Sequence, residues 1–175
     1  MKKALFFLII VCMLFVSCKD KGNESASDPA ATTPLEGSWR NTATSTGATE
    51  TTTLTFGGSN VAMVIAGESA TDPSDPSNPP EGTLTMAFNM TATFRLDNNQ
   101  ILITPKTATL SMIIIPTADP STPMPLANES GDNALSLLNM HLNQESSLGT
   151  YTLNGTTLSL TFTGDSSATP FNKLP

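Results

Sequence analysis

Cysteine and histidine are almost absent from this chain, which has only Cys12, Cys18 and His141. A disulfide framework needs several thiols, and the usual zinc sites need several Cys or His ligands. A Ser–His or Cys–His catalytic pair would depend on His141 alone, and no second group in the sequence completes it. We therefore expect no enzyme, no metal site and no cofactor.

Basic residues are also scarce, with 8 Lys and Arg against 15 Asp and Glu. Nucleic acids and anionic lipid head groups are bound through clustered Lys and Arg, which replace counterions. The acidic residues are scattered along the chain, so their expected role is solubility. The composition therefore argues against a nucleic-acid partner.

The chain has no apolar run long enough to span a bilayer as a helix. Its unbroken run from Ala4 to Val16 has 13 residues, whereas a spanning helix needs roughly 20. Lys2 and Lys3 precede this run and the small residue Ser17 follows it. These are the three parts of an export signal, so we expect residues 1–17 to be removed. The remaining chain has 6 basic and 15 acidic residues, a net charge of −9.

The segment Phe15-Val16-Ser17-Cys18 resembles the lipobox of bacterial lipoproteins, in which the cysteine after a small residue is diacylated and becomes the N-terminus. The resemblance implies lipidation at Cys18. Two or three acyl chains hold a protein at a membrane, since each buried CH₂ contributes about 0.8 kcal/mol. By resemblance to enteric lipoproteins, Lys19 favours the outer membrane, in the periplasm or at the surface. The alternative is a plain secreted protein cut near Ser17.

The chain from Cys18 onward has two regions. Residues 18–34 are polar and contain Pro29 and Pro34, so we expect a flexible tether. Residues 35–175 number 141, enough for one domain with its own core.

The domain has a strongly β-like pattern. From Leu84 to Leu96, seven apolar residues occupy every second position, which is hard to reconcile with a helix. Asn98-Asn99 is then a candidate tight turn, and this register places Phe94 opposite Ile103. After Pro105 the alternation changes phase, which predicts a bulge or corner there.

Further strands and one helix complete the predicted elements. The run from Tyr151 to Leu158 has Asn154-Gly155 at its centre, which predicts a type I′ hairpin that pairs Tyr151 with Leu158. The prolines of Asp72–Pro80 and Pro116–Pro125 indicate exposed loops. Apolar residues at helical spacing predict an amphipathic helix between Asn133 and Glu145, with Asp132 or Asn133 as its N-cap. Other strands are expected at Gly37–Ala43, Glu50–Phe56 and Val61–Ala66. The seven or eight strands suit a barrel or sandwich.

The motif Gly37-Ser38-Trp39 at the first strand resembles that of the lipocalins and of lipocalin-like domains on bacterial lipoproteins. The resemblance implies an all-β, up-and-down antiparallel barrel of seven to eight strands, with one short helix before the last hairpin and Trp39 at the closed end. In lipocalins an arginine on the last strand stacks on this tryptophan. The candidates for that role here are Lys173, Arg40 and Arg95.

A shared face of the long strand is the candidate ligand-binding surface. Met86, Phe88, Met90 and Phe94 fall on it, and flexible methionines suit an apolar ligand of variable shape. The alternative is a barrel filled by its own side chains, as small eight-stranded barrels can be.

Three functions stay open on the sequence alone. The first is a membrane-anchored, lipocalin-like binder of a small hydrophobic ligand. The second is a structural or protein-interaction lipoprotein of the cell envelope with a packed, ligand-free barrel and an unknown protein partner. The third, an enzyme, lacks any recognisable catalytic set of residues.

Overall fold

The fold was derived from a computed structural model that describes residues 33–71 and 81–175. The export signal, Cys18 and the predicted loop Asp72–Pro80 lie outside the described residues. The strands are β1 (Gly37–Ser45), β2 (Ala48–Gly57), β3 (Asn60–Ala70), β4 (Gly82–Asp97), β5 (Gln100–Pro116), β6 (Met124–Ser130), β7 (Ser146–Asn154), β8 (Thr157–Phe162) and β9 (Thr169–Lys173). A short helix α2 (Asp132–Leu135) and a 3₁₀ turn η1 (Ser136–Leu138) precede β7.

Eight of these strands close into an antiparallel barrel. Their order around it is β1, β2, β3, β4, β5, β7, β8, β9, and β9 pairs back with β1. Strand β6 is an addition to β5 outside this ring. The structure therefore confirms the predicted all-β, up-and-down barrel, although β9 follows the β7–β8 hairpin, so that hairpin is not the last.

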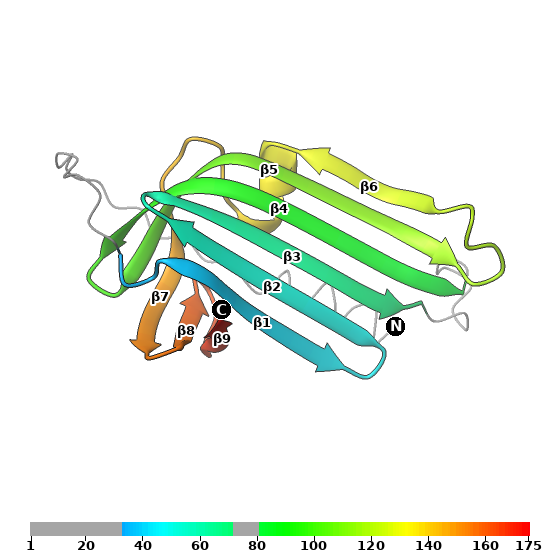
Figure 1. The fold of residues 1–175 in the computed structure, drawn as a ribbon. Coiled ribbons are helices and arrows are strands. Elements are labelled where there is room, and N and C mark those ends of the chain that lie inside the picture. Colours follow the sequence, from blue (N-terminus) through cyan, green and yellow to red (C-terminus); the bar gives the residue numbers. More distant parts are fainter. Residues whose placement is uncertain (1–32, 72–80) are drawn as a thin grey trace.

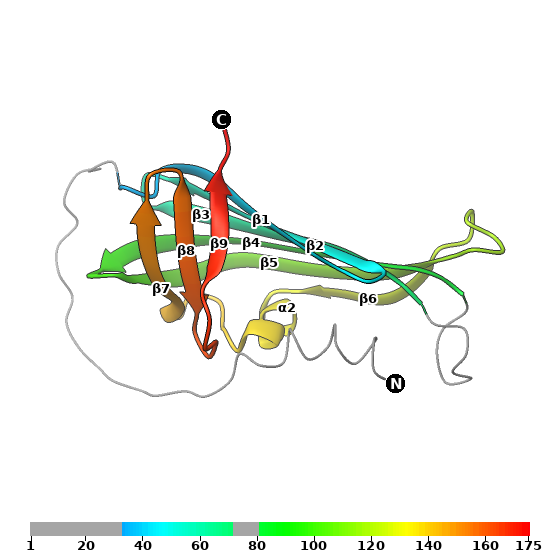
Figure 2. The same ribbon diagram turned by 90° about the horizontal axis from the view of Figure 1, so that it is seen from below.

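The barrel is closed at one end only (Figures 1 and 2). Strand β9 pairs with β1 only at Trp39 and Arg40, and β7 pairs with β5 only from Gln100 to Ile103. Beyond these points the strands continue as a sheet to which β6 is added. We call this part the open sheet. It comprises residues 41–45, 48–52, 65–70, 82–88, 110–116 and 124–130.

The registers of β4 and β5 follow the sequence prediction closely. Phe94 pairs with Ile103, and Asn98 adopts a φ of 55° in the turn. The register shifts where Thr91 pairs with Thr107 and Ala92 pairs with Pro105, so Lys106 is the extra residue. This bulge confirms the expected break at Pro105, where proline cannot donate to the ladder.

The β7–β8 hairpin forms, but its predicted register is wrong. Tyr151 pairs with Leu160, and Leu158 instead faces Leu153. The turn begins one residue later than predicted, at Gly155, which adopts a φ of 58°. Glycine reaches positive φ without steric cost, so it takes the first turn position and shifts the pairing.

The predicted helix between Asn133 and Glu145 is also wrong in length, because α2 ends at Leu135. Gly131 rather than Asp132 or Asn133 precedes the helix, and no side chain caps it. The Asp132 carboxylate instead accepts a hydrogen bond of 2.7 Å from the Leu142 backbone N–H. This contact folds the segment back into a compact loop, so the apolar spacing reflects burial against the sheet and not a continuous helix.

The core fills the closed part of the barrel and continues onto the open sheet, where Met86 and Phe88 belong to the same cluster as Ala134, Leu135 and Met140. Every strand of the barrel contributes, and the largest fully buried side chains include Trp39, Phe56, Leu54, Met63, Met90, Ile101, Ile103, Leu158 and Phe171. Phe56 packs edge-on against Phe94 with ring centres 5.0 Å apart, a favoured aromatic geometry.

Candidate functional site

The Gly37-Ser38-Trp39 motif lies where β1 meets β9. The Trp39 side chain is 1% exposed, and its Nε1–H donates a 2.7 Å hydrogen bond to the Leu35 carbonyl oxygen. The Lys173 ammonium lies 5.3 Å from the centre of the Trp39 ring. Gly37 makes room for this lysine, because a Cβ there would lie 3.0 Å from Lys173 Cε. Of the three candidate cations, Lys173 is therefore the one that covers Trp39.

The four residues predicted to face a ligand are buried. Met86, Phe88, Met90 and Phe94 are 7% exposed or less, and all four belong to one continuous core. The other members of that core come from the barrel strands and from the segment with Ala134, Leu135 and Met140, so the face identified from the sequence packs inward. Its role in ligand binding stays a prediction.

A depression opens to solvent on the barrel wall, where the β2–β3 turn lies beside the bulge of β5. Its volume is about 410 Å³, and its surface is mostly apolar. It is lined by Thr55, Gly57, Asn60, Val61, Ala62, Thr91, Ala92 and Lys106. An open depression of this kind leaves much of a small molecule in water, unlike an enclosed ligand pocket.

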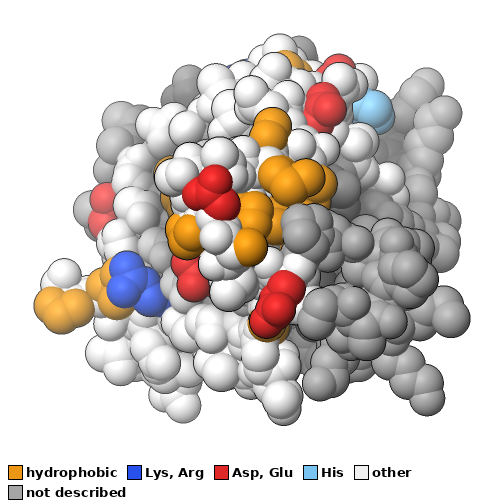
Figure 3. Space-filling view, turned by 90° about the vertical axis from the view of Figure 1, so that its right-hand side faces the viewer, with side chains coloured by type: hydrophobic (Ala, Val, Ile, Leu, Met, Phe, Trp, Pro, Cys, Tyr) orange, Lys and Arg blue, Asp and Glu red, His pale blue; other side chains and the backbone are white. Residues whose placement is uncertain are grey.

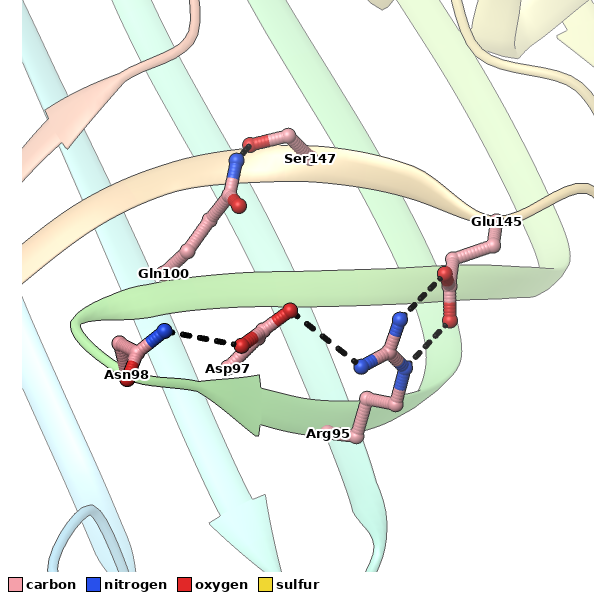
Figure 4. A network of polar contacts seen from close by, with 6 residues as sticks. All are labelled: Arg95, Asp97, Asn98, Gln100, Glu145 and Ser147. Atoms are coloured by element: carbon pink, nitrogen blue, oxygen red, sulfur yellow. Dashed lines mark hydrogen bonds and ion pairs between the residues drawn. The ribbon is translucent and has the colours of Figure 1, made fainter. Parts of the chain in front are cut away.

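Polar contacts join the β4–β5 hairpin to the segment that leads into β7 (Figure 4). Arg95 donates two hydrogen bonds of 2.8 Å to Glu145, and Gln100 donates one of 2.8 Å to Ser147. The hydrogen bonds from Arg95 lower the pKa of the Glu145 carboxyl and raise the pKa of Arg95 itself. Because both side chains are about half exposed, the pair contributes at most about 1 kcal/mol. The pair lies at the seam where β7 joins β5 and the barrel closes.

Charge is unevenly distributed between the two ends of the molecule. All the basic side chains of the described residues (Arg40, Arg95, Lys106 and Lys173) belong to the barrel end, and the ranges of the open sheet contain none. The open sheet carries Glu50, Glu68 and Glu129 instead. Figure 3 looks onto its far end and shows acidic side chains around an apolar patch. Met124 and Leu126 of β6 are 44% and 51% exposed.

One of these carboxylates lies on the face of the sheet that continues the barrel interior. Glu50 pairs with Ala43 on β1 and with Gly67 on β3, in the row of residues that includes Met86. Burial raises its pKa above the ordinary value. Glu50 is not among the site residues predicted from the sequence, although its alternation with Thr52 and Leu54 is a signal for an inward-facing position.

Clusters of metal-binding side chains are not found in the part of the chain that the structure describes. No group of three or more His, Cys, Asp or Glu side chains there could hold a metal ion. His141 is exposed. Within the described ranges no helix is long and apolar enough to cross a membrane.

No protein-family model, curated protein or solved structure matches this chain. Its function must therefore be argued from its own residues.

Proposed function

We propose that this chain is a lipid-anchored protein of the bacterial envelope whose barrel is a packed scaffold for protein contact. The observation that carries the proposal is the burial of Met86, Phe88, Met90 and Phe94 in one continuous core. The export signal and the lipobox-like Cys18 support the anchor.

The packed core argues against a carrier of small molecules. A carrier encloses most of its ligand in a cavity of roughly 300–1,000 Å³. Here Trp39, Phe56 and Phe171 are among the largest buried side chains of the core, each 1% exposed or less. Eight-stranded barrels can be filled in this way.

The open sheet supplies the surface for protein contact. It exposes the apolar side chains of Met124 and Leu126 on β6, the strand that also carries Glu129. It also leaves strand edges without a partner strand among the described residues. Exposed apolar patches and free strand edges are typical of surfaces that bind other proteins.

The second candidate function is the binding of a small apolar molecule in the depression beside Val61, Ala62 and Ala92. Its apolar lining favours this candidate. A tryptophan at position 62 would fill the depression, whereas the same change at Ala66, an exposed position on the same strand, would not.

Two experiments test these proposals. The first is metabolic labelling with a fatty-acid probe, in which we expect Cys18→Ala to abolish labelling and Ser17→Ala, which keeps a small residue before the cysteine, to preserve it. Unchanged labelling of Cys18→Ala would overturn the anchor.

The second experiment is a titration of the lipid-free mature chain, carrying Cys18→Ser, with a fluorescent fatty acid. If the barrel is a packed scaffold, we expect no saturable binding of the fatty acid. Saturable binding that Ala62→Trp abolishes and Ala66→Trp preserves would establish the second candidate instead.

A further inference from the structure

The open sheet has two free edges, and they differ in their protection. One is the outer edge of β6, and the other is β1 from Thr42 to Ser45 (Figure 1). Within the described ranges no strand pairs with either edge. Free edges can recruit foreign strands, so natural proteins usually protect them with proline, bulges or charge.

The β6 edge has all of these protective features. Pro125 lies within the strand, and the register shifts at the next residue, Leu126. Glu129 is an exposed carboxylate on the strand. A second strand would meet a proline, a bulge and the carboxylate of Glu129, so this edge is built to stay free.

The β1 edge has none of them. Thr42, Ala43, Thr44 and Ser45 are uncharged and exposed, without proline or bulge. Strand β9 leaves β1 after Arg40, where the Asn41 side chain donates a 2.7 Å hydrogen bond to the Pro170 carbonyl oxygen. Pro170 has no backbone N–H to continue the ladder. The edge beyond is therefore regular β-strand with its outward backbone groups available for pairing.

We infer that the β1 edge pairs antiparallel with the same edge of a second copy of this chain. The segment from Thr42 to Ser45 is neutral, so two copies meet there without opposed like charges. Its outer-face threonines also suit self-pairing, because this sheet already joins strands through hydroxyl pairs: Thr42 with Thr51 at 3.2 Å and Thr91 with Thr107 at 2.7 Å.

Symmetry limits the assembly to two copies. An antiparallel pair of identical edges uses the same surface on both subunits, which is the commonest arrangement in homo-oligomers. Each subunit has one unprotected edge in its open sheet, so the assembly ends at a dimer and does not extend into a fibre. The inference does not depend on the function proposed above, since a scaffold and a carrier could both pair in this way.

The test is sedimentation of the lipid-free mature chain carrying Cys18→Ser, compared with two variants of equal charge. Thr44→Lys places like charges at the centre of the pairing, and Asn128→Lys places the same charge on the exposed β6 edge. We expect a dimer for the unmodified edge, a dissociation constant raised about tenfold or more by Thr44→Lys, and no change from Asn128→Lys. Fluorescence of Trp39, the only tryptophan, verifies that each variant is folded.

Three results would overturn the inference. They are a monomer at every accessible concentration, a folded Thr44→Lys variant that dimerises as well as its parent, and a dimer that Asn128→Lys disrupts. If the chain stays monomeric but pairs with an added peptide strand, the edge is a docking site for another protein and the second copy is not its partner.

Discussion

The ammonium group of Lys173 lies 5.3 Å from the centre of the Trp39 ring, and the two residues are directly paired across β1 and β9. The first and last strands of the barrel are thus joined by a backbone pair and a cation–π contact. Among the three cations that the sequence offered for this role, Lys173 is the one that lies over the ring.

Removing this cation should weaken the closure of the barrel. Lys173→Ala is expected to lower the free energy of unfolding by about 0.5–1 kcal/mol, the range for a cation–π contact at an exposed site. Urea denaturation followed by Trp39 fluorescence measures the loss. Lys173→Arg keeps the charge over the ring and serves as the control, so an equal loss in both variants would show that the charge contributes nothing.

Truncating the tryptophan should cost much more. Trp39 is fully buried, and its Nε1–H is hydrogen bonded to Leu35. Trp39→Ala is expected to destabilise the domain by roughly 3–5 kcal/mol, as buried Trp truncations do. Denaturation followed by far-UV circular dichroism checks this value. A loss under about 0.5 kcal/mol, the scale of a surface substitution, would contradict the central position of Trp39.

A close approach of two strands makes Gly149 essential where the barrel closes. Gly149 pairs with Ile101 on one side and with Phe162 on the other, and an added Cβ would overlap the Thr161 carbonyl oxygen. Gly149→Ala should therefore lower the free energy of unfolding by about 1–3 kcal/mol, the usual cost of overpacking.

The matched control is Gly57→Ala on β2, where the added methyl group would make only ordinary contact. Thermal or urea denaturation should show a change within about 0.5 kcal/mol for this variant. Equal losses at the two glycines would mean that the close approach at Gly149 is not a constraint.

The half-buried carboxyl of Glu50 makes stability depend on pH. Burial raises its pKa in the folded protein, so the folded protein binds this proton more tightly than the unfolded chain does. Stability therefore falls as the pH rises from the unfolded pKa through the raised folded pKa, and the full cost is present above both.

Glu50→Gln removes this ionisation. We expect the variant to be more stable than its parent at neutral pH and to lose that advantage at a pH below the ordinary pKa of glutamate. Urea denaturation at both pH values, with the exposed Glu68→Gln as a control on the neighbouring strand, measures the difference. An advantage that is the same at both pH values would exclude ionisation as its cause.

Local alternation was enough to predict the β class and much of the β4–β5 hairpin. Residues 84–96 alternate without a break, and Pro105 marks the change of phase, so the pairing of Phe94 with Ile103 follows from neighbours in the sequence. The β7–β8 register was missed because two turn geometries compete at Asn154-Gly155, and only the chain around them decides which residue takes the positive φ.

Long-range features could not be read from the sequence. The contact of Lys173 with Trp39 joins residues from opposite ends of the domain, and its three candidate cations are equivalent until the barrel is closed. The open sheet depends on where β9 leaves β1 and β7 leaves β5. Likewise, the alternation of apolar residues from Met86 to Phe94 shows which side chains point inward. It says nothing about whether those side chains enclose a cavity or fill the barrel.

The most direct test of the packed scaffold is native mass spectrometry of the lipid-free mature chain, carrying Cys18→Ser and purified from its own host. A filled barrel predicts the mass of the protein alone, as one or two copies of the chain. A small apolar molecule that co-purifies in a fixed ratio with the chain would contradict the account.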